Sequence, residues 1–342
     1  MEVGVDSFAI VLPDAKTGIV PTASARMAHL LEEIEVSDRA GIDVFGIGEH
    51  HREDFADASP AVILAAAAGR TRQIRLTSAV SVLSAADPVR LFQDFATLDL
   101  VSQGRAEIIV GRGSFQEAHK LFGVSLDDYD RVFAEKLELL LQLRRDSHPH
   151  WQGKFRPPLT GQAVFPRPLQ ETMPLWLGVG GTPQSFVRAG LLGLPLMVAI
   201  IGGNHSRFRP LIDLYREAGR KAGHAPETLK VGIHSFGFVG DTDDQAKESL
   251  WPGWELMANR MAKERGSAPA SRQRYEVEVG PQGALLVGSP ETVASRIKEV
   301  SRLLGGINRI AFQLSMAANN HETHLKAINL LGRKVIPLLR NA

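Results

Sequence analysis

The chain has 342 residues, of which 44% are hydrophobic and 23% are charged, and 39 Lys and Arg against 38 Asp and Glu give a net charge of +1. This balance, together with the lack of a dense basic block, argues against nucleic acid or a membrane surface as partner and favours a small molecule. The sequence contains no cysteine, which excludes disulfides, thiolate catalysis and zinc sites with sulfur ligands.

Short apolar runs alternate with helical patterns along the sequence, which is typical of a buried parallel sheet covered by helices. Eight such runs predict an α/β fold, a parallel (β/α)8 TIM-type barrel that forms one domain over residues 1–342. The predicted strands span residues 3–8, 44–48, 74–80, 106–110, 175–179, 196–201, 231–238 and 309–314.

Several connections between these strands carry helix start signals. Asp87-Pro88 and Ser289-Pro290 each place a capping side chain before a proline at the first helical position. The connections 151–174 and 240–288 are longer than a barrel requires, so we expect loop insertions at the C-terminal face, where such loops shape the active site. Within the second of these, the acidic residues between 241 and 244 indicate a solvated helix start.

Two further features bear on location. The apolar stretch 190–203 is too short to span a bilayer and contains Pro195. The first residues lack the basic start and apolar run of a secretory signal. We therefore expect a cytoplasmic protein.

The second predicted strand leads into Glu49-His50-His51. Adjacent side chains of an extended chain point to opposite sides, so at most one of the two histidines faces the barrel mouth. This geometry disfavours a metal pair. One inward histidine is either an acid, base or hydrogen-bond donor near neutral pH, or a structural histidine that bonds to neighbouring backbone.

The fifth predicted strand runs into a glycine-rich helix start. Gly180 and Gly181 allow backbone amides to approach an anion, Thr182 is placed to cap, and Ser185 adds a hydroxyl on the first turn. The segment is either a phosphate cradle or a glycine turn without ligand. It is not a dinucleotide fingerprint, because the third glycine and the distant acidic residue are missing.

Arginines at two places suit an anionic ligand. Arg112 lies between Gly111 and Gly113 at the end of the fourth predicted strand, and Arg131 lies in the following helical segment. Either can donate charge-assisted hydrogen bonds to a phosphate, and either taken alone is also typical of a protein surface.

Taken in order, these motifs resemble the bacterial luciferase-like flavin-dependent monooxygenase superfamily over nearly the whole chain. The resemblance includes the segments 78–83 and 87–90 around the third strand, Gly104-Arg105, and the late segment 288–291. It implies that His50 is the active-site histidine beside the flavin ring and that Ala79-Val80 is a bulge with a non-proline cis peptide that supports this ring. It implies a flavin-phosphate site formed by Arg112, Arg131, Gly180, Gly181, Thr182 and Ser185.

The resemblance also implies an activity. We expect a monooxygenase in which reduced FMN, supplied by a separate flavin reductase, and dioxygen oxidise a small organic substrate, in an enzyme that is at least a homodimer. Phe8 and His234 are candidate substrate residues because they lie near strand ends. Gly111 occupies the place of a reactive cysteine in the light-emitting enzymes, so light emission is not implied.

Three alternatives stay open at this point. A deazaflavin coenzyme could serve in hydride transfer, as it does in members of the same superfamily. The chain could bind flavin without turnover, because a fold does not establish catalysis. A metal-dependent hydrolase that uses Glu49 and the histidines is the third, although no metal site is expected from the spacing.

Overall fold

The computed structural model describes residues 1–14, 17–113, 115–266, 268–314 and 321–340. Eight parallel strands close into a barrel, because β12 pairs with β1 at one junction and β9 pairs with β10 at the other. This confirms the predicted TIM-type barrel, and each predicted strand corresponds to one barrel strand. The barrel strands are β1 (Glu2–Ser7), β2 (Val44–Ile47), β3 (Arg75–Ser78), β5 (Ala106–Gly111), β8 (Leu175–Val179), β9 (Leu196–Ala199), β10 (Val231–Val239) and β12 (Arg309–Gln313).

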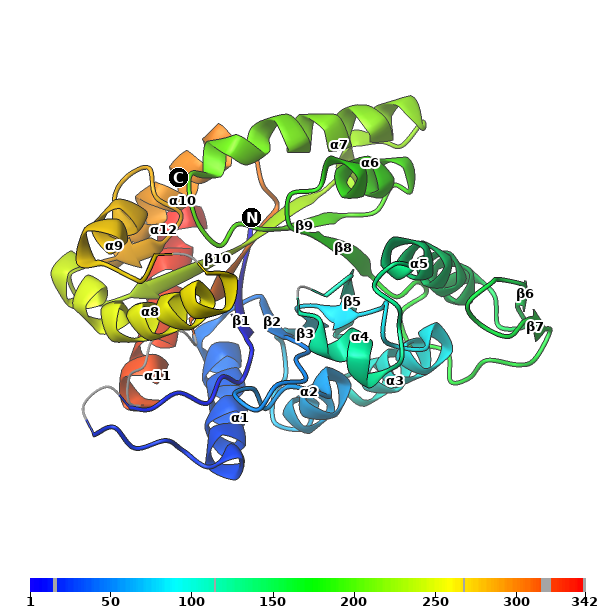
Figure 1. Cartoon of the computed structure of the whole chain (residues 1–342), viewed down its shortest axis with the longest axis horizontal. Coiled ribbons are helices and arrows are strands. Elements are labelled where there is room, and N and C mark those ends of the chain that lie inside the picture. The colour runs from blue at the N-terminus through cyan, green and yellow to red at the C-terminus, as the bar shows by residue number, and fades with distance from the viewer. Residues whose placement is uncertain (15–16, 114, 267, 315–320, 341–342) are drawn as a thin grey trace.

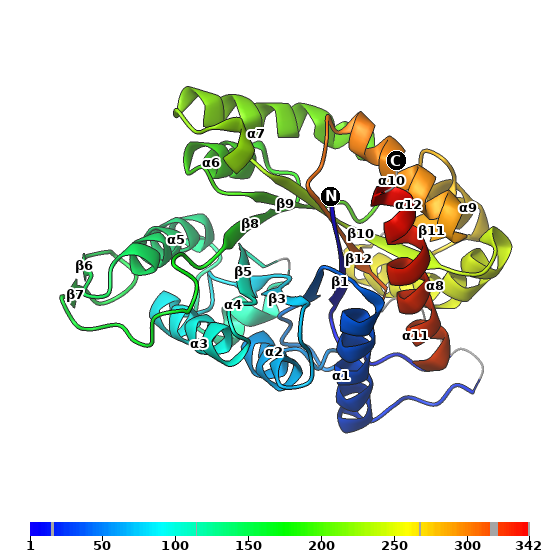
Figure 2. The same cartoon turned by 180° about the vertical axis from the view of Figure 1, so that it is seen from behind.

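Helices surround this barrel, as Figures 1 and 2 show from opposite sides. The main hydrophobic core lies between the strands and this outer layer and includes the fully buried Phe45, Phe92, Phe133 and Phe186. The surrounding helices are α1 (Ala23–Ala40), α2 (Pro60–Ala68), α3 (Pro88–Val101), α5 (Tyr129–Arg145), α6 (Pro183–Leu191), α7 (Arg209–Lys221), α10 (Pro290–Leu303), α11 (His321–Leu330) and α12 (Ile336–Arg340), with the π-helical turn η3 (Leu331–Val335) before the last.

The predicted helix starts are confirmed. The Asp87 carboxylate accepts hydrogen bonds from the amides of Val89 and Arg90 at the start of α3. The Ser289 hydroxyl accepts from the amide of Thr292 at the start of α10. Each cap satisfies amides that have no partner inside the helix, so the local sequence fixes where these helices begin.

The third predicted strand differs from the expectation of one continuous run. β3 ends at Ser78, the Ala79–Val80 peptide is cis, and the short strand β4 (Ser81–Val82) then pairs with β5. The Ser78 hydroxyl donates to the carbonyl of Ile109 and accepts from its amide. The Ser78 side chain therefore makes hydrogen bonds that the strand backbone would otherwise make with β5. The apolar pattern of the sequence does not reveal such an interruption of the strand.

The two insertions contain more regular structure than the loops we expected. Residues 150–160 form a hairpin of β6 (His150–Trp151) and β7 (Leu159–Thr160). The second insertion holds α8 (Asp243–Arg265), α9 (Arg272–Val279) and β11 (Leu286–Gly288), the last of which extends the sheet beside β10. Pro252 lies inside α8 and obscured the helical pattern. The acidic helix start is confirmed, since Thr242 caps α8 and Asp243 lies in its first turn.

The helix α8 covers the end of the barrel where the strands terminate. Both α8 and α4 (Glu117–Leu121) lie toward the viewer in Figure 1 and behind the strands in Figure 2. Ion pairs Arg52–Glu264 and Arg260–Asp54 tie α8 to the loop that follows β2. The insertion thus lies against the segment that carries the candidate catalytic histidine. Among the described residues, no helix has the length and apolar character needed to cross a membrane.

Candidate active site

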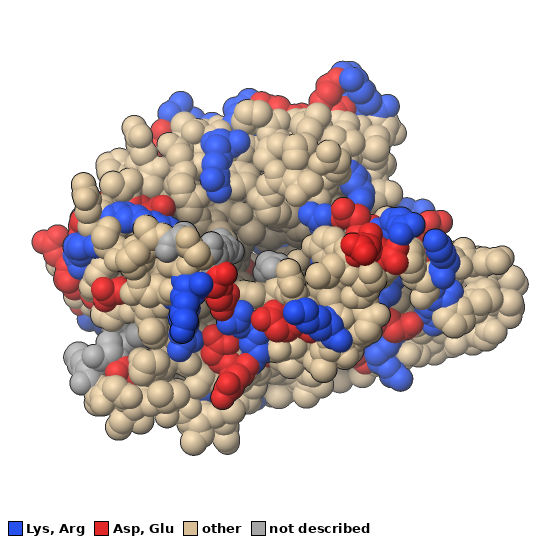
Figure 3. All heavy atoms as spheres, in the orientation of Figure 1, with Lys and Arg blue, Asp and Glu red and all other residues tan. Residues whose placement is uncertain are grey.

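The face of the molecule at the strand ends is hollowed at its centre, and Lys, Arg, Asp and Glu are intermixed around this hollow without a large area of one sign (Figure 3). Two glycines at the end of β2 leave space for the side chains around them. A Cβ atom on Gly46 would collide with Asp6 Oδ1, and one on Gly48 would lie 2.8 Å from Asp57 Oδ2 and 2.5 Å from Phe8 Cδ1. Both positions must lack a side chain for these groups to pack here.

The first histidine of the pair, His50, lies in this space. Its Nδ1 atom lies 2.9 Å from Oδ2 of Asp57, whose side chain is fully buried. Burial raises the pKa of Asp57, and the neighbouring His50 opposes that shift. The His50 ring contacts Phe8 and Phe55, with centroid distances of 4.6 and 4.3 Å. His50 is therefore an ordered imidazole between aromatic rings and a buried carboxyl group.

A second histidine with a carboxylate partner also contacts Phe8. His234 comes from β10, and its Nδ1 atom lies 2.6 Å from Oδ2 of Asp6 on β1. Phe8 stacks on the His234 ring with a centroid distance of 5.6 Å and an interplanar angle of 10°. The structure thus places Phe8 in contact with both His50 and His234.

The neighbouring His51 has different partners. Its Nε2 atom lies 3.2 Å from Oε1 of Glu49, and the other carboxylate oxygen of Glu49 accepts from the amide of Val82. Glu49 therefore joins the β2 loop to β4. Within the part of the chain that the structure describes, no group of three or more potential metal-ligating side chains gathers.

Val80 follows the cis peptide and packs over two glycines. A Cβ atom on Gly111 would lie 2.6 Å from Val80 Cγ2, and one on Gly178 would lie 2.7 Å from Val80 Cγ1. Glycine at these two strand positions leaves the room that the valine side chain occupies. The bulge is therefore supported from β5 and β8.

The glycine turn before α6 is open on one side. A Cβ atom on Gly180 would meet no described atom within 4 Å. Thr182 occupies the N-cap position but makes no capping hydrogen bond, so the prediction that its side chain caps the helix is wrong. Its hydroxyl instead accepts from Arg112 Nη2 at 3.3 Å. Ser185 is buried one turn into the helix.

Arg112 joins this turn to α5. It pairs with Asp130, and its guanidinium lies 5.1 Å from the ring centroid of Tyr129. Arg188 on α6 lies close enough to Arg112 that the two charges interact, although burial is the larger cause of the lowered pKa of Arg188. Two guanidinium groups, a hydroxyl and the amides of a helix start together fit a phosphate group.

Arg131 does not lie with the candidate phosphate-binding groups at the glycine turn. Its side chain is 62% exposed and pairs with Asp128 one turn away on its own segment. Among the described residues, no hydrogen bond or ion pair joins Arg131 to Arg112 or to the turn. A phosphate role for Arg131 would require its side chain to reorient.

Sequence reasoning missed three side chains of this site. Asp6 lies two residues before Phe8 and so on the same strand face, a signal that was available. Arg188 follows Ser185 by three residues and shares its helix face, which was also readable. Asp57 lies in a loop, and nothing in the local sequence indicates that it reaches His50.

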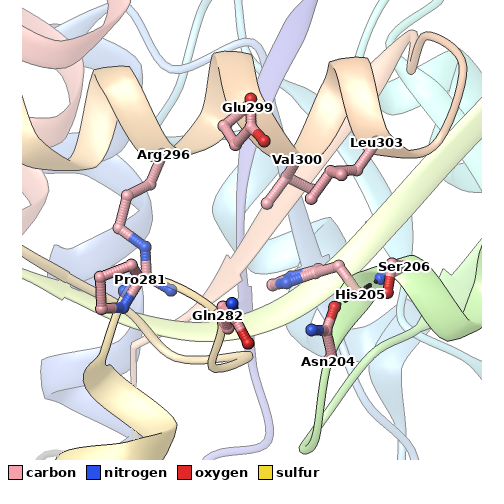
Figure 4. Close-up of a pocket in the computed structure, with 9 residues that line it drawn as sticks. All are labelled: Asn204, His205, Ser206, Pro281, Gln282, Arg296, Glu299, Val300 and Leu303. Atoms are coloured by element: carbon pink, nitrogen blue, oxygen red, sulfur yellow. Dashed lines mark hydrogen bonds between the residues drawn. The ribbon is translucent and has the colours of Figure 1, made fainter.

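A pocket of about 350 Å³ lies outside the barrel, between α10, the loop before β11 and the 3-10 helix η1 (His205–Phe208) (Figure 4). Arg296 extends from α10 toward Pro281 and Gln282 and donates to the carbonyl oxygens of Val279, Gly283 and Leu285. His205 is buried here, and burial first, with Arg296 second, lowers its pKa to about 4. We refer to this pocket between α10, η1 and the loop before β11 as the lateral pocket.

Comparisons with known proteins agree with this architecture. Residues 7–306 match the family model described as luciferase-like monooxygenase. N-acetyl-S-alkylcysteine monooxygenase of Bacillus subtilis is 28% identical over 312 residues, covering 86% of this chain and 88% of that protein.

Two solved structures share the fold. The oxygenating constituent of 3,6-diketocamphane monooxygenase of Pseudomonas putida, in complex with FMN, has a TM-score of 0.81 at 20% identity, covering 99% of this chain and 98% of that one. The coenzyme F420 dependent tetrahydromethanopterin reductase of Methanopyrus kandleri has a TM-score of 0.72 at 20% identity, covering 98% and 99%. With a family model matched over most of its length, the chain belongs to the luciferase-like monooxygenase family.

Proposed function

We propose that this protein is a monooxygenase that uses reduced FMN and dioxygen to place one oxygen atom on a small organic substrate. The observation that carries the proposal is the common location of three groups at the carboxyl ends of barrel strands. These are the His50 imidazole, the bulge at Ala79-Val80, and the glycine turn with Arg112. Membership of the luciferase-like monooxygenase family supports the same activity.

Each group has a distinct role in this proposal. Arg112, Thr182 and the amides of Gly180 and Gly181 hold the flavin phosphate, and the Ala79-Val80 bulge lies behind the flavin ring. The bound reduced flavin supplies the electrons that activate dioxygen. His50 holds or accepts a proton beside the ring, at a site from which aromatic side chains exclude water.

The substrate lies between Phe8 and His234 in this proposal. Ile10, Leu12 and Met257 form an apolar cluster with Phe8 beside the site, which suits an uncharged organic molecule. The chain lacks a nicotinamide fingerprint, so we propose that a separate reductase supplies the reduced FMN. We also propose a homodimer as the assembled form.

An anaerobic titration with two cofactors tests this proposal. The protein is mixed with chemically reduced FMN or with a reduced deazaflavin, binding is measured by absorbance, and ¹⁸O-labelled dioxygen is admitted with a panel of small ketones and thioethers. We expect tighter binding of reduced FMN and ¹⁸O in a product. Preference for the deazaflavin would favour hydride transfer, and FMN binding without any product from the panel or oxygen consumption would favour a protein that binds flavin without turnover. Either result contradicts the proposal.

A further inference from the structure

We infer that Asp57 and Asp6 are positioning residues that fix the tautomers of His50 and His234, so that each imidazole presents an unprotonated Nε2 atom to the barrel mouth. The catalytic consequence of this arrangement rests on the proposed function. The tautomers themselves are properties of this chain and can be measured without a cofactor.

The contacts show which ring nitrogen faces the carboxyl group in each pair. Nδ1 of His50 lies 2.9 Å from Asp57, and Nδ1 of His234 lies 2.6 Å from Asp6. An ionised carboxylate only accepts hydrogen bonds, so with Asp57 and Asp6 ionised, as we infer, Nδ1 is the donor in each pair. A neutral imidazole that donates from Nδ1 has its lone pair on Nε2. Among the described residues, the side-chain hydrogen bonds of both histidines are made through Nδ1 and none through Nε2.

Both carboxyl groups are held in place by the packing around them. The side chains of Asp57 and Asp6 are 0% and 4% exposed. Gly46 leaves the room that Asp6 occupies, and Gly48 leaves the room for Asp57 and for the edge of the His50 ring. Gly46 in β2 and Gly48 just after this strand therefore accommodate one carboxyl group each. Because each aspartate has a glycine that makes room for it, both histidine–carboxylate pairs are specific parts of the site's packing.

Phe8 separates the two imidazoles. It contacts the His50 ring with a centroid distance of 4.6 Å and stacks on the His234 ring at 5.6 Å. The site therefore offers two proton-accepting atoms next to one aromatic ring, one beside the proposed flavin ring and one at the proposed substrate position. The carboxylate behind each imidazole stabilises the imidazolium that forms when Nε2 takes a proton.

The first test measures the tautomers directly. The full-length protein is labelled with ¹⁵N-histidine, long-range ¹H–¹⁵N correlations are recorded without cofactor, and His50→Gln and His234→Gln assign the signals. We expect a proton on Nδ1 and none on Nε2 for both rings. A proton on Nε2 of either neutral ring would overturn the inference, and this result needs no variant of the aspartates.

Isosteric variants then test the cause. An amide at position 57 can donate to Nδ1, so Asp57→Asn should move the His50 proton to Nε2 and leave His234 unchanged, while Asp6→Asn should do the reverse. Glu49→Gln is the matched control, because Glu49 contacts His51 instead, and it should change neither ring. An unchanged His50 tautomer in folded Asp57→Asn would overturn the positioning role.

Turnover separates this inference from the proposed function. We expect Asp57→Asn to lower kcat by about 100-fold or more while the Kd for reduced FMN changes less than about twofold, because a misplaced proton affects the reaction and not binding. An unchanged kcat would overturn the catalytic consequence. Correct tautomers in a protein that does not bind reduced FMN would instead contradict the proposed function and leave the positioning role intact.

Discussion

His234 at the barrel mouth and His205 in the lateral pocket are buried, and the His50 side chain is only 10% exposed, but these histidines face opposite charges. His50 and His234 each contact a carboxyl group through Nδ1, whereas His205 lies beside the Arg296 guanidinium. A carboxylate stabilises an imidazolium, and a guanidinium opposes it. A low exposure is therefore not enough for a histidine to serve in proton transfer, because the charge beside the ring also affects its protonation. The charge of the partner either adds to the effect of burial, as Arg296 does at His205, or opposes it.

Removing one imidazole from the mouth should give the largest effect. We expect His50→Ala to lower kcat by about 100-fold or more, which is the usual contribution of a positioned acid or base. His51→Ala is the matched control, since this neighbour bonds Glu49 and should retain most of the activity. Steady-state rates of product formation check both variants. Equal losses in the two would remove the distinction between these histidines.

Acid should destabilise the protein through His205. Its pKa is about 4 in the folded protein and 6.5 in the unfolded chain, so the fold favours the neutral ring. The associated stability is present above pH 6.5 and is lost as the pH falls through 4, by up to about 3 kcal/mol. We expect His205→Gln to lose that much less stability between pH 7 and pH 4, as measured by urea unfolding. The same slope in both proteins would contradict this account of His205.

The barrel mouth and the lateral pocket also differ in how an arginine is held, which bears on anion binding. Arg112 contacts Thr182 at the glycine turn, whereas Arg296 in the lateral pocket is held by backbone carbonyls. We expect Arg112→Gln to raise the Kd for reduced FMN about tenfold, the effect of losing one charge-assisted contact. Arg296→Gln should leave this Kd within about twofold. A larger effect of Arg296→Gln would move the phosphate site to the lateral pocket.

The smallest effect concerns the two causes of the His205 pKa. Burial is the larger cause and Arg296 the smaller, so Arg296→Gln should recover less than half of the depression. NMR titration of the His205 ring signals in folded Arg296→Gln measures this recovery. A return to the ordinary value of 6.5 would show that the guanidinium, and not burial, dominates.

The sequence predicted the barrel because its signal is repeated. Eight apolar runs each produced one barrel strand, and the caps at Asp87 and Ser289 began helices where expected. Local patterns sufficed there because strand burial and helix capping depend on neighbouring residues. The division of the third strand escaped prediction, since the bond between Ser78 and Ile109 joins positions far apart in the chain.

The site was less predictable for the same reason. The family resemblance and strand-end positions pointed to His50, His234 and Phe8, but no pattern linked them to their carboxyl partners. Asp6 and His234 are 228 residues apart and meet only because the closed barrel brings β1 near β10. The start of helix α8 was predicted, but its length was missed because Pro252 interrupts its period.

Gly46 and Gly48 have a consequence for how this protein can be altered by directed evolution. Each glycine depends on the aspartate it accommodates, since a methyl group at Gly46 would displace Asp6 and one at Gly48 would collide with Asp57. A library that varies single positions would therefore score both glycines as intolerant. Libraries that vary Gly46 together with Asp6, and Gly48 together with Asp57, are the ones that can find new arrangements of the mouth.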